Sequence, residues 1–538
     1  MRIDALQLEN EGKLVADYRR HEDIMQFFEY PPFQPLTNRL EELKKRTFQR
    51  DQLVDILKMK NAAWGAGQET LERIKELKNP DTVVVVGGQQ AGLLTGPLYT
   101  INKIISILQF AEKQERALGV PVLPVFWIAG EDHDYEEINH IYLPQKDKLK
   151  KFTFNQPVYK KTPISQVLLD KKRLKKWLDQ LFAELPETVH TEEIHHMVTK
   201  AAVQSESFTD FFAILIHALF QEEGIILLDA ADERIRRIEN GYFIRLIENN
   251  QKITRAVFET YGQLLEKGYS PTFEPEPADG HLFYHWDNER ILLKRTETGA
   301  WKGKNDEIEL STEQLLETAE NHPENLSNNV ITRPLMQEML LPVLAFIGGP
   351  GEISYWSLLK QAFSILDLNM PPVIPRLSFT FVPEKVRKAL MNTGIPIESA
   401  LNNGVEAEKI EWFENKQSPP IAEIADELKR KITEAHRPIQ DLAKNIRDDV
   451  GALSEKNLTY LHREVDFLRN RMIRALEEKY KHVLDQYDLI QSTLHPENGL
   501  QERIWNVLPF LNKYGMDVIG KLTRSSFSFE KQHYIVYL

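Results

Sequence analysis

The sequence contains no cysteine among its 538 residues. This absence excludes disulfide scaffolds, thiolate nucleophiles and cysteine-ligated metal sites. Long hydrophobic runs are missing too: apolar stretches such as LLPVLAFI near residue 345 are far shorter than the ~20 residues that a membrane span needs. The N-terminal MRIDALQLENEGKLVADYRR mixes acids and bases and lacks the apolar centre of a signal peptide. We therefore expect a cytoplasmic protein with no membrane partner.

Basic residues are in the minority. The chain has 67 lysines and arginines against 80 acidic residues, a formal net charge of -13. Because a nucleic-acid binder needs a basic face or stripe, we expect no nucleic-acid partner. The hydrophobic share of 42% is spread over a chain too long for one ordinary core. We therefore expect a central domain with inserted or appended parts.

A strand, a glycine turn, a helix and a second strand follow one another after residue 81. TVVVVGG is short and fully apolar, which is typical of a strand buried on both faces of a parallel sheet. Next come GGQQAGLLTGP, a helical pattern from Tyr99 to Glu115 and the apolar PVLPVFWIAG. Such a unit forms a right-handed crossover and places ligands at the carboxyl ends of its strands. Further strand candidates are GIILLDAAD at 224–232 and PVLAFIGGPGE at 342–352.

Apolar residues recur at heptad-like steps of three and four from Ile421 to Ile446, and again from Leu458 to Ile490. We expect an antiparallel hairpin that turns near Gly451 and buries its seam internally or against a second copy. The fold predicted is thus α/β: a Rossmann-like parallel-sheet core with two inserted subdomains and a long antiparallel α-helical coiled-coil hairpin. Burial of its seam against a second copy would give a homodimer. The predicted parts are 1–148 (N-terminal helices and first part of the core), 149–221 (helical insert), 222–232 (core strand), 233–326 (second insert), 327–383 (second part of the core), 384–498 (coiled-coil hairpin) and 499–538 (a C-terminal segment docking on the core).

The first candidate site is the glycine loop after the first core strand. Its glycines let a ligand approach the backbone closely, and the amides of the following helix favour an anion. No Gly-Lys-Ser/Thr follows, so the loop is not a Walker loop, and it lacks the GxGxxG pattern of dinucleotide sites. A tight turn without a ligand is the alternative. The residues assigned to substrate binding here are Gly88, Gln89, Gln90 and Gly92.

The second candidate is the acidic loop GEDHD directly after the second core strand. Acids and a histidine are costly to bury there without partners, which favours a functional role. The histidine could act as an acid or base or stabilise a transition state, and the carboxylates could hold an amine or a magnesium ion. We assign His133, Asp132 and Asp134 as catalytic and no residue as a metal ligand. A solvated loop that caps the next helix is the alternative.

The third candidate, GGPGE, repeats the strand-glycine-helix layout and could form the opposite wall of the same crevice. Gly349, Glu352 and Tyr355 are assigned to substrate binding, with a plain helix start as the alternative. Just upstream, Asn329 and Arg333 precede the fourth strand. An arginine fork suits a carboxylate or phosphate, so both are added to the substrate site, although a structural ion pair is the common role of a lone arginine.

Two fainter signals concern a nucleotide. FVPEK opens a helix at a proline and could accept a phosphate. Near the C-terminus, Arg503 and Asn506 lie in an otherwise apolar predicted helix. We assign Glu384, Lys385 and Asn506 to nucleotide binding. Helix capping and docking of the tail on the core are the alternatives.

Five motifs in order resemble the BshC family, the cysteine ligases of bacillithiol biosynthesis: VVVVGGQQAGLLTGP, FWIAGEDHDYEEINH, SNNVITRPLMQEMLLP, FIGGPGEISYW and LQERIWNVLPFLNKYG. The resemblance spans nearly the whole chain. It implies a Rossmann-like core with two connecting inserts, a hairpin for dimerisation, and ligation of L-cysteine to glucosaminyl-malate through an amide bond in the last step of the pathway.

Such an amide does not form from a free carboxylate without activation, so the resemblance implies ATP or ADP binding, and magnesium is a candidate cofactor through the acidic loop. The chain has neither the HxGH signature nor the KMSKS loop of nucleotidylyl-transferring ligases. Acyl-adenylate, acyl-phosphate and nucleotide-independent routes therefore stay open. Two other readings remain: a metal-dependent hydrolase or transferase with His133, Asp134 and His140 as ligands, and a coiled-coil scaffold that binds a nucleotide.

Overall fold

The centre of the molecule is a parallel sheet with the strand order β13-β12-β2-β3-β6. The computed structural model describes residues 1–9, 11–145 and 148–538. The chain moves outward from β2 in one direction through β3 and β6, and in the other through β12 and β13, which confirms the Rossmann-like core. The strands are β2 (Val83–Gln89), β3 (Val122–Ile128), β6 (Ile226–Asp229), β12 (Val343–Gly348) and β13 (Val373–Pro375).

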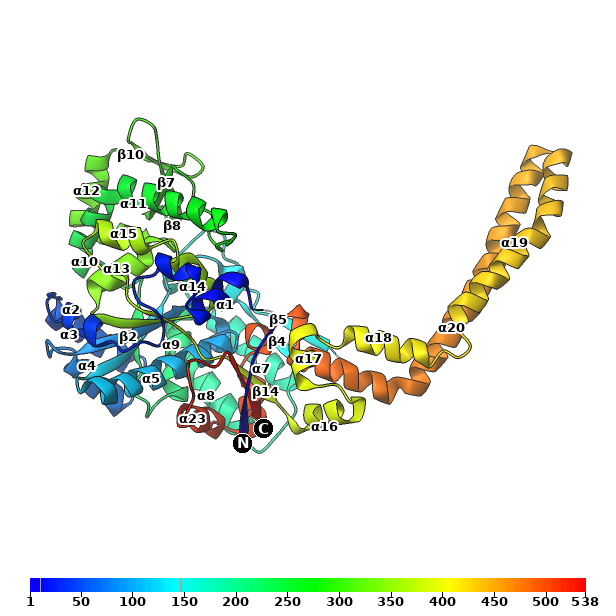
Figure 1. Ribbon diagram of the computed structural model, residues 1–538, viewed down its shortest axis with the longest axis horizontal. Helices are drawn as coiled ribbons and strands as arrows, with labels where there is room; N and C mark the ends of the chain where they lie inside the picture. The colour runs from blue at the N-terminus through cyan, green and yellow to red at the C-terminus, as the bar shows by residue number, and fades with distance from the viewer. Residues whose placement is uncertain (10, 146–147) are drawn as a thin grey trace.

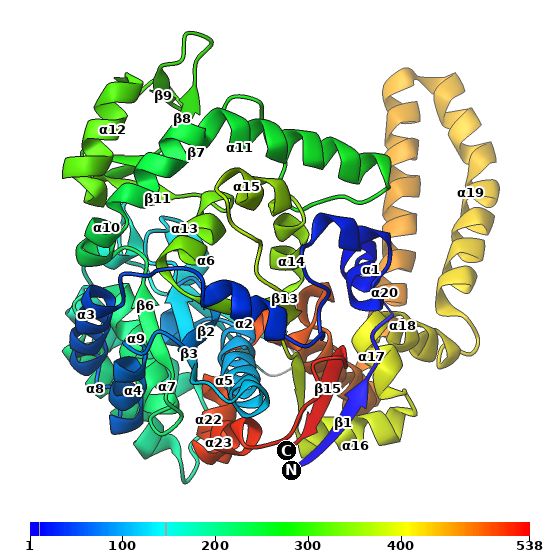
Figure 2. The same ribbon diagram turned by 60° about the vertical axis from the view of Figure 1, so that its left-hand side comes forward.

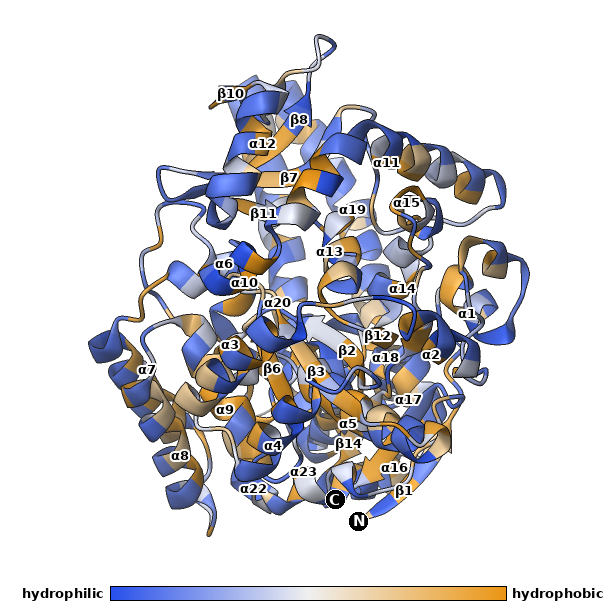
Figure 3. Ribbon diagram, turned by 90° about the vertical axis from the view of Figure 1, so that its left-hand side faces the viewer, coloured by the Kyte–Doolittle hydropathy of each residue, from blue (hydrophilic) through white to orange (hydrophobic). Residues whose placement is uncertain are grey.

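Both faces of this sheet are buried, as its uninterrupted apolar strands predict. Along β2, Val83 and Val85 belong to the core on one face, where α5 (Tyr99–Leu118) packs. Val84 and Val86 alternate to the other face, under α3 (Arg50–Ala63) and α4 (Gln68–Glu76). Because side chains alternate along a strand, β2 contributes to two separate hydrophobic cores, one on each face of the sheet. Figure 3 shows β3 and β6 in hydrophobic colours at the centre of the molecule.

Two inserts interrupt the core, and Figure 2 shows them on different sides of the sheet. The first follows β3 and holds β4 (His140–Gln145), β5 (Lys148–Thr153), α7 (Lys171–Glu184), α8 (Thr191–Gln204) and α9 (Phe208–Leu219). The second follows β6 and contains a five-stranded sheet in the order β10-β9-β8-β7-β11. Its elements are α10 (Glu233–Ile238), α11 (Asn240–Glu266), β7 (Asp279–Trp286), β8 (Glu289–Arg295), β9 (Trp301–Gly303), β10 (Glu309–Leu310), α12 (Thr312–Asn321) and β11 (Leu326–Asn328).

The two chain ends meet in a small sheet, β1-β15-β14 (Figure 1). β1 (Arg2–Leu6) pairs antiparallel with β15 (His533–Tyr537), which runs parallel to β14 (Phe379–Val382). The expectation of N-terminal helices in 1–148 thus missed β1, because its hydrogen-bonding partner lies at the opposite end of the sequence. The C-terminal helices α21 (Gln501–Ile504), α22 (Leu508–Tyr514) and α23 (Asp517–Thr523) pack onto the core.

A hairpin of α19 (Ile421–Ile446) and α20 (Asp448–Leu494) projects away from the body (Figure 1). Its turn is at Arg447, so the expected turn near Gly451 is wrong. Gly451 is buried inside α20, where an added Cβ would lie 2.8 Å from Lys444 Cγ. The glycine allows close contact between the helices rather than breaking one.

None of the helices in the described ranges combines the length and the apolar character that a membrane span requires.

The segment 384–415 does not belong to the projecting hairpin, although it was predicted as part of it. It forms three shorter helices, α16 (Glu384–Thr393), α17 (Ile397–Asn403) and α18 (Glu406–Asn415), that pack on the body end of α20. Val386, Leu390 and Leu401 share a core there with Ile490 of α20. The hairpin therefore rests on a helical base that is fixed to the small sheet through Val382 and Ile535.

Candidate active site

The order of the strands reverses between β2 and β12, and a cleft opens there at the carboxyl ends of the strands. This is the place where open α/β sheets bind ligands. We call it the main cleft; its volume is about 720 Å³. It brings the three predicted loops together, because its lining includes Gly88, Gln89, Gln90, Asp132, Arg333, Gly349, Glu352 and Tyr355.

The glycine at the end of β2 is required by the sheet itself. A Cβ on Gly88 would lie 2.5 Å from the carbonyl oxygen of Trp127 on the neighbouring strand. Gly92 serves a different purpose: a Cβ there would lie 2.7 Å from Gly96 Cα, so it closes the loop on itself. Gly92 lines a second cavity beside the main cleft, which we call the side chamber. The predicted glycine loop therefore borders two cavities.

One wall of the main cleft is cationic. Lys103 of α5 is fully buried beneath it and donates to the carbonyl oxygen of Gly88 (2.6 Å), to Gln89 Oε1 (3.1 Å) and to Glu352. Burial lowers the pKa of Lys103, and Glu352 opposes that change. This lysine joins the first and third loops, since it bonds to both. Arg376 and Arg503 also line the cleft, and none of these three basic residues was assigned to the site from sequence.

Arg333, near the start of α13 (Thr332–Leu340), also belongs to this cationic wall. Its guanidinium donates to Gln337 Oε1 (3.0 Å) and to the hydroxyl of Tyr355 (2.6 Å). Both partners are neutral, and no carboxylate of the described chain lies within ion-pair distance of it. Its positive charge is therefore available to an anionic ligand.

The opposite wall is acidic. Asp132 and Glu137 both line the main cleft, and Gln90 Nε2 donates to Asp132 Oδ2 (2.7 Å) and to Glu137 Oε2 (2.9 Å). The backbone amide of His133 donates to the other oxygen, Asp132 Oδ1, at 2.8 Å. Gln90 thus links the glycine loop to the acidic loop. The result is a cleft with opposite charges on its two sides.

His133 and Asp134 lie next to the cleft but are not among its lining residues. The ring of His133 instead faces the second insert, where Arg290 of β8 places Nη1 3.2 Å from His133 Nδ1 and 3.5 Å from Asp132 Oδ1. Arg290 is buried, lies over the ring of Phe283 at 3.7 Å and donates to the carbonyl oxygen of Asn328 (2.6 Å). The insert therefore holds the acidic loop through a buried arginine, which no local sequence signal marked.

Arg290 also determines the chemistry of the His133 ring. An arginine only donates hydrogen bonds, so Nδ1 of the neutral imidazole accepts and its hydrogen is on Nε2. Burial lowers the pKa of His133, and Arg290 and Lys161 lower it further, while Asp134 and Asp132 oppose them. The ring is therefore held neutral near pH 7, as a hydrogen-bond acceptor from the insert.

Other predicted residues have structural partners. Asn329 Oδ1 caps α13 by accepting from the amides of Ile331 (2.9 Å) and Thr332 (3.2 Å), and the residue does not line the main cleft. Asn506 is buried at the side chamber and donates to the carbonyl oxygens of Leu94 (2.8 Å) and Gly96 (2.7 Å).

The remaining two nucleotide candidates lie elsewhere. Glu384 pairs with Arg387 at 2.7 Å on the exposed start of α16, and neither Glu384 nor Lys385 lines either cavity. The structure therefore does not bring them together with Asn506. Their assignment to a nucleotide stays a prediction.

Within the described ranges, one group has the spacing to hold a metal ion: Asp132, His133 and Asp134, whose ligand atoms lie within 4.8 Å of one another. His140 is not part of this group, so the ligand set predicted for a metal-dependent hydrolase is not assembled. Arg290 already occupies His133 Nδ1 and adds a positive charge beside the group. These contacts disfavour a dication at this position.

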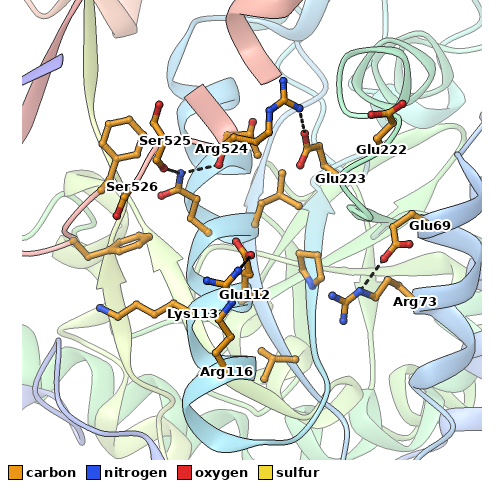
Figure 4. A pocket seen from close by; sticks show the side chains of 18 of the residues that line it. Glu69, Arg73, Glu112, Lys113, Arg116, Glu222, Glu223, Arg524, Ser525 and Ser526 are labelled. Carbon is orange, nitrogen blue, oxygen red and sulfur yellow. Dashed lines mark hydrogen bonds and ion pairs between the residues drawn. The ribbon is translucent and has the colours of Figure 1, made fainter. Parts of the chain in front are cut away.

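A further hollow of about 740 Å³ lies at the opposite edge of the sheet, beside the start of β3 (Figure 4). Six of its charged side chains form ion pairs with one another: Arg73 with Glu69 at 3.4 Å, Arg524 with Glu223 at 3.7 Å, and Arg116 with Glu112. No wall of one charge results from this arrangement. In the main cleft, by contrast, Arg333 and Arg503 have no carboxylate of the described residues within ion-pair distance, so that cleft is the better candidate for the active site.

Comparison with known families covers almost the entire chain. Residues 1–377 match the family model "Bacillithiol biosynthesis BshC, N-terminal Rossmann-like domain". Residues 379–538 match "Bacillithiol biosynthesis BshC, C-terminal coiled-coil domain". The division falls between β13 and β14, where the parallel core ends.

Curated relatives match over the same length. A protein of Oceanobacillus iheyensis is 39% identical and one of Bacillus licheniformis 40% identical, each over 100% of both chains. A protein of Geobacillus sp. strain WCH70 is 41% identical over 93% of this chain and 92% of its own. All three carry the name "Putative cysteine ligase BshC".

The Arg290 contact predicts a change in the titration of His133. In Arg290→Met the pKa of His133 should rise, because the cation that disfavours the protonated ring is removed while Asp132 and Asp134 remain. Histidine NMR signals followed against pH measure this pKa, with His133→Asn identifying the signal. Lys294→Met, which removes a positive charge from the same strand but from a pair with Glu276, should leave it unchanged. An unchanged or lower pKa in Arg290→Met contradicts the assignment.

Proposed function

The chain belongs to the BshC family of bacillithiol biosynthesis, and from this premise we propose that it ligates L-cysteine to glucosaminyl-malate. The reaction joins the cysteine carboxyl group to the glucosamine amine in an amide bond, as the last step of the pathway. The names of the relatives support a cysteine ligase. The observation that carries the proposal for this chain is the separation of charge across the main cleft.

Glucosaminyl-malate has the matching distribution of charge, with two carboxylates on its malyl group and an amine on its sugar. The malyl carboxylates are proposed to bind Arg333 and the loop around Gly88, because an arginine fork suits a carboxylate. The sugar amine is then directed to Asp132 on the acidic wall. At about 720 Å³ the cleft is within the size range of small-molecule sites, roughly 300–1,000 Å³.

Asp132 is the proposed proton acceptor, since it is the residue of the acidic loop that lines the cleft. The amine nitrogen attacks the carbonyl carbon of an activated cysteinyl group, the C–N bond forms, and the bond to the leaving group breaks. The amine binds as an ammonium, so one proton passes to the Asp132 carboxylate before the attack, and the second proton, lost as the C–N bond forms, goes to the departing group. His133 contributes by holding the loop against the second insert through Arg290, and Asp134 lies 3.8 Å from Nε2 of the same ring.

Activation of the cysteine carboxyl group requires a donor of chemical energy, and ATP with a magnesium ion is the proposed source. The residues predicted to hold the nucleotide do not form one pocket. Asn506 uses its amide within the protein, and Glu384 and Lys385 line neither cavity. No step of the proposed reaction is therefore assigned to them.

The ligase proposal is tested in cells that lack this chain and are complemented with variants. Thiols and amines are labelled, and bacillithiol and glucosaminyl-malate are measured by mass spectrometry. Wild type should restore bacillithiol, whereas Asp132→Asn should lower its rate of formation about 10²–10⁴-fold and leave glucosaminyl-malate to accumulate, because the general base is lost.

Glu136→Gln is the matched control, since Glu136 is an exposed carboxylate of the same segment that does not line the cleft. It should restore bacillithiol like wild type. Unchanged bacillithiol in cells that lack the chain would contradict the ligase proposal. Full activity of Asp132→Asn would remove the role of that carboxylate.

The hairpin is proposed to join two copies of the chain in a homodimer. Its helices leave apolar side chains in solvent, among them Ile424 (49% exposed), Leu428 (46%), Leu468 (58%) and Met472 (45%), which line a groove of about 490 Å³. An exposed apolar stripe of this kind marks an interaction surface. A second hairpin presents the same heptad pattern and can bury it by a two-fold arrangement.

Charge placed in this groove should separate the copies. The double variant Leu428→Glu with Leu468→Glu is expected to be monomeric by size-exclusion chromatography with light scattering, at a concentration where wild type is dimeric. The matched control, Lys431→Glu with Arg471→Glu, alters residues that are each 63% exposed and should remain dimeric. A monomeric wild type, or a dimeric Leu428/Leu468 variant, would contradict the proposal.

A further inference from the structure

The side chamber is a second cavity that opens beside the main cleft. Its volume is about 320 Å³, and it lies between the loop after β2, the start of β4 and the segment after α21. It shares with the main cleft the residues Gln89, Gln90, Tyr99, Glu137 and Arg503. The two cavities therefore meet along one border, which a pair of co-substrates could use.

The walls of the side chamber are fixed by hydrogen bonds from three separate segments. The amide of Leu98 donates to the carbonyl oxygen of Trp505 at 2.8 Å, and the backbones of Tyr142 and Trp505 form an isolated parallel β-bridge. Asn506 holds the carbonyl oxygens of Leu94 and Gly96. The shape of the chamber is thus determined before a ligand enters.

Two opposite charges are placed at the border. Arg503 is exposed, and no carboxylate of the described residues lies within ion-pair distance of its guanidinium. Glu137 accepts one hydrogen bond there from the neutral Gln90 amide. Tyr99 lies within electrostatic reach of both: burial raises the pKa of its hydroxyl, Arg503 lowers it and Glu137 raises it. Behind these groups, Pro97, Ile138, Ile141 and Ile504 give the chamber an apolar back.

We infer that the side chamber binds the α-amino acid substrate, with its carboxylate on Arg503 and its ammonium on Glu137. A free amino acid carries both charges one carbon apart and a side chain on the same carbon, which the apolar back would receive. A guanidinium binds a carboxylate through two parallel hydrogen bonds. The chamber is at the small end of ligand pockets, ~300–1,000 Å³, so it suits a small amino acid and not glucosaminyl-malate.

This inference rests on the proposed ligase function and assigns each co-substrate to its own cavity. The amino acid in the side chamber and the acceptor in the main cleft would meet at Gln89 and Gln90. The cysteine carboxyl group at Arg503 would then lie next to the acidic wall that directs the acceptor amine. Arg503 and Glu137 are thus binding residues for the amino acid, whereas Arg333 serves the acceptor.

Calorimetric titration of L-cysteine, in the presence of a reductant, into the full-length protein tests the assignment. Arg503→Met should weaken cysteine binding about 10- to 100-fold, because the carboxylate loses its charged hydrogen-bonding partner. Glu137→Gln should weaken it as well. Arg333→Met, the matched control in the main cleft, should bind cysteine like wild type. Cysteinamide lacks the carboxylate, so wild type should bind it no more tightly than Arg503→Met binds cysteine.

Wild-type affinity for cysteine in Arg503→Met would overturn the inference, and so would a loss of binding in Arg333→Met instead. Absence of cysteine binding to wild type in the presence of glucosaminyl-malate would also overturn it. The ligase proposal is judged separately, by bacillithiol in complemented cells. If wild type restores bacillithiol in cells but Arg503→Met binds cysteine as wild type does, the chamber assignment is refuted and the ligase proposal is not.

Discussion

The arrangement of the site depends on one buried ion pair, Arg376 with Glu502. Arg376 follows the last strand of the parallel sheet and donates to Glu502 at 2.7 and 2.6 Å, and Asn102 of α5 donates to the same carboxylate at 2.6 Å. Burial alone would raise the pKa of Glu502, but Arg376 holds it below its ordinary value. Because a buried charge is costly without its partner, this pair fixes the C-terminal segment against the edge of the sheet. Arg503, the next residue, is thereby placed at the border of the two cavities.

The same principle explains how loops from distant parts of the chain keep their places. Lys103 joins the first and third glycine loops from below, Gln90 joins the first loop to the acidic loop, and Arg290 joins the acidic loop to the second insert. Each link is a polar side chain that is buried or half-buried and satisfied on both sides. The parallel sheet places the three loops along one edge. The links hold these loops in the positions that form a cleft with one cationic and one acidic wall. The second insert thus contributes a side chain, Arg290, that positions the acidic loop of the site.

Local patterns in the sequence predicted the sheet and the three loops, because buried parallel strands are continuous apolar runs and their turns are rich in glycine. Gly88, Asp132, Arg333 and Glu352 were accordingly assigned to sites on separate segments, and the structure places all four around the main cleft. The linking residues could not be predicted, since each is a lone polar side chain whose partner is remote: Lys103 lies 249 residues from Glu352, and Arg290 lies 157 from His133. The hairpin turn was misplaced for a related reason, since Gly451 is explained by packing against the other helix and not by chain reversal.

The central claim is that the cationic wall of the main cleft recognises the malyl group of the acceptor. Equilibrium dialysis of labelled glucosaminyl-malate against wild type and Arg333→Met tests it most directly, with labelled glucosamine as the ligand that lacks the malyl group. We expect Arg333→Met to weaken binding of glucosaminyl-malate about 10- to 100-fold, because a charged hydrogen-bonding partner is lost, while glucosamine binds both proteins equally weakly. Equal affinity of the two proteins for glucosaminyl-malate would contradict it.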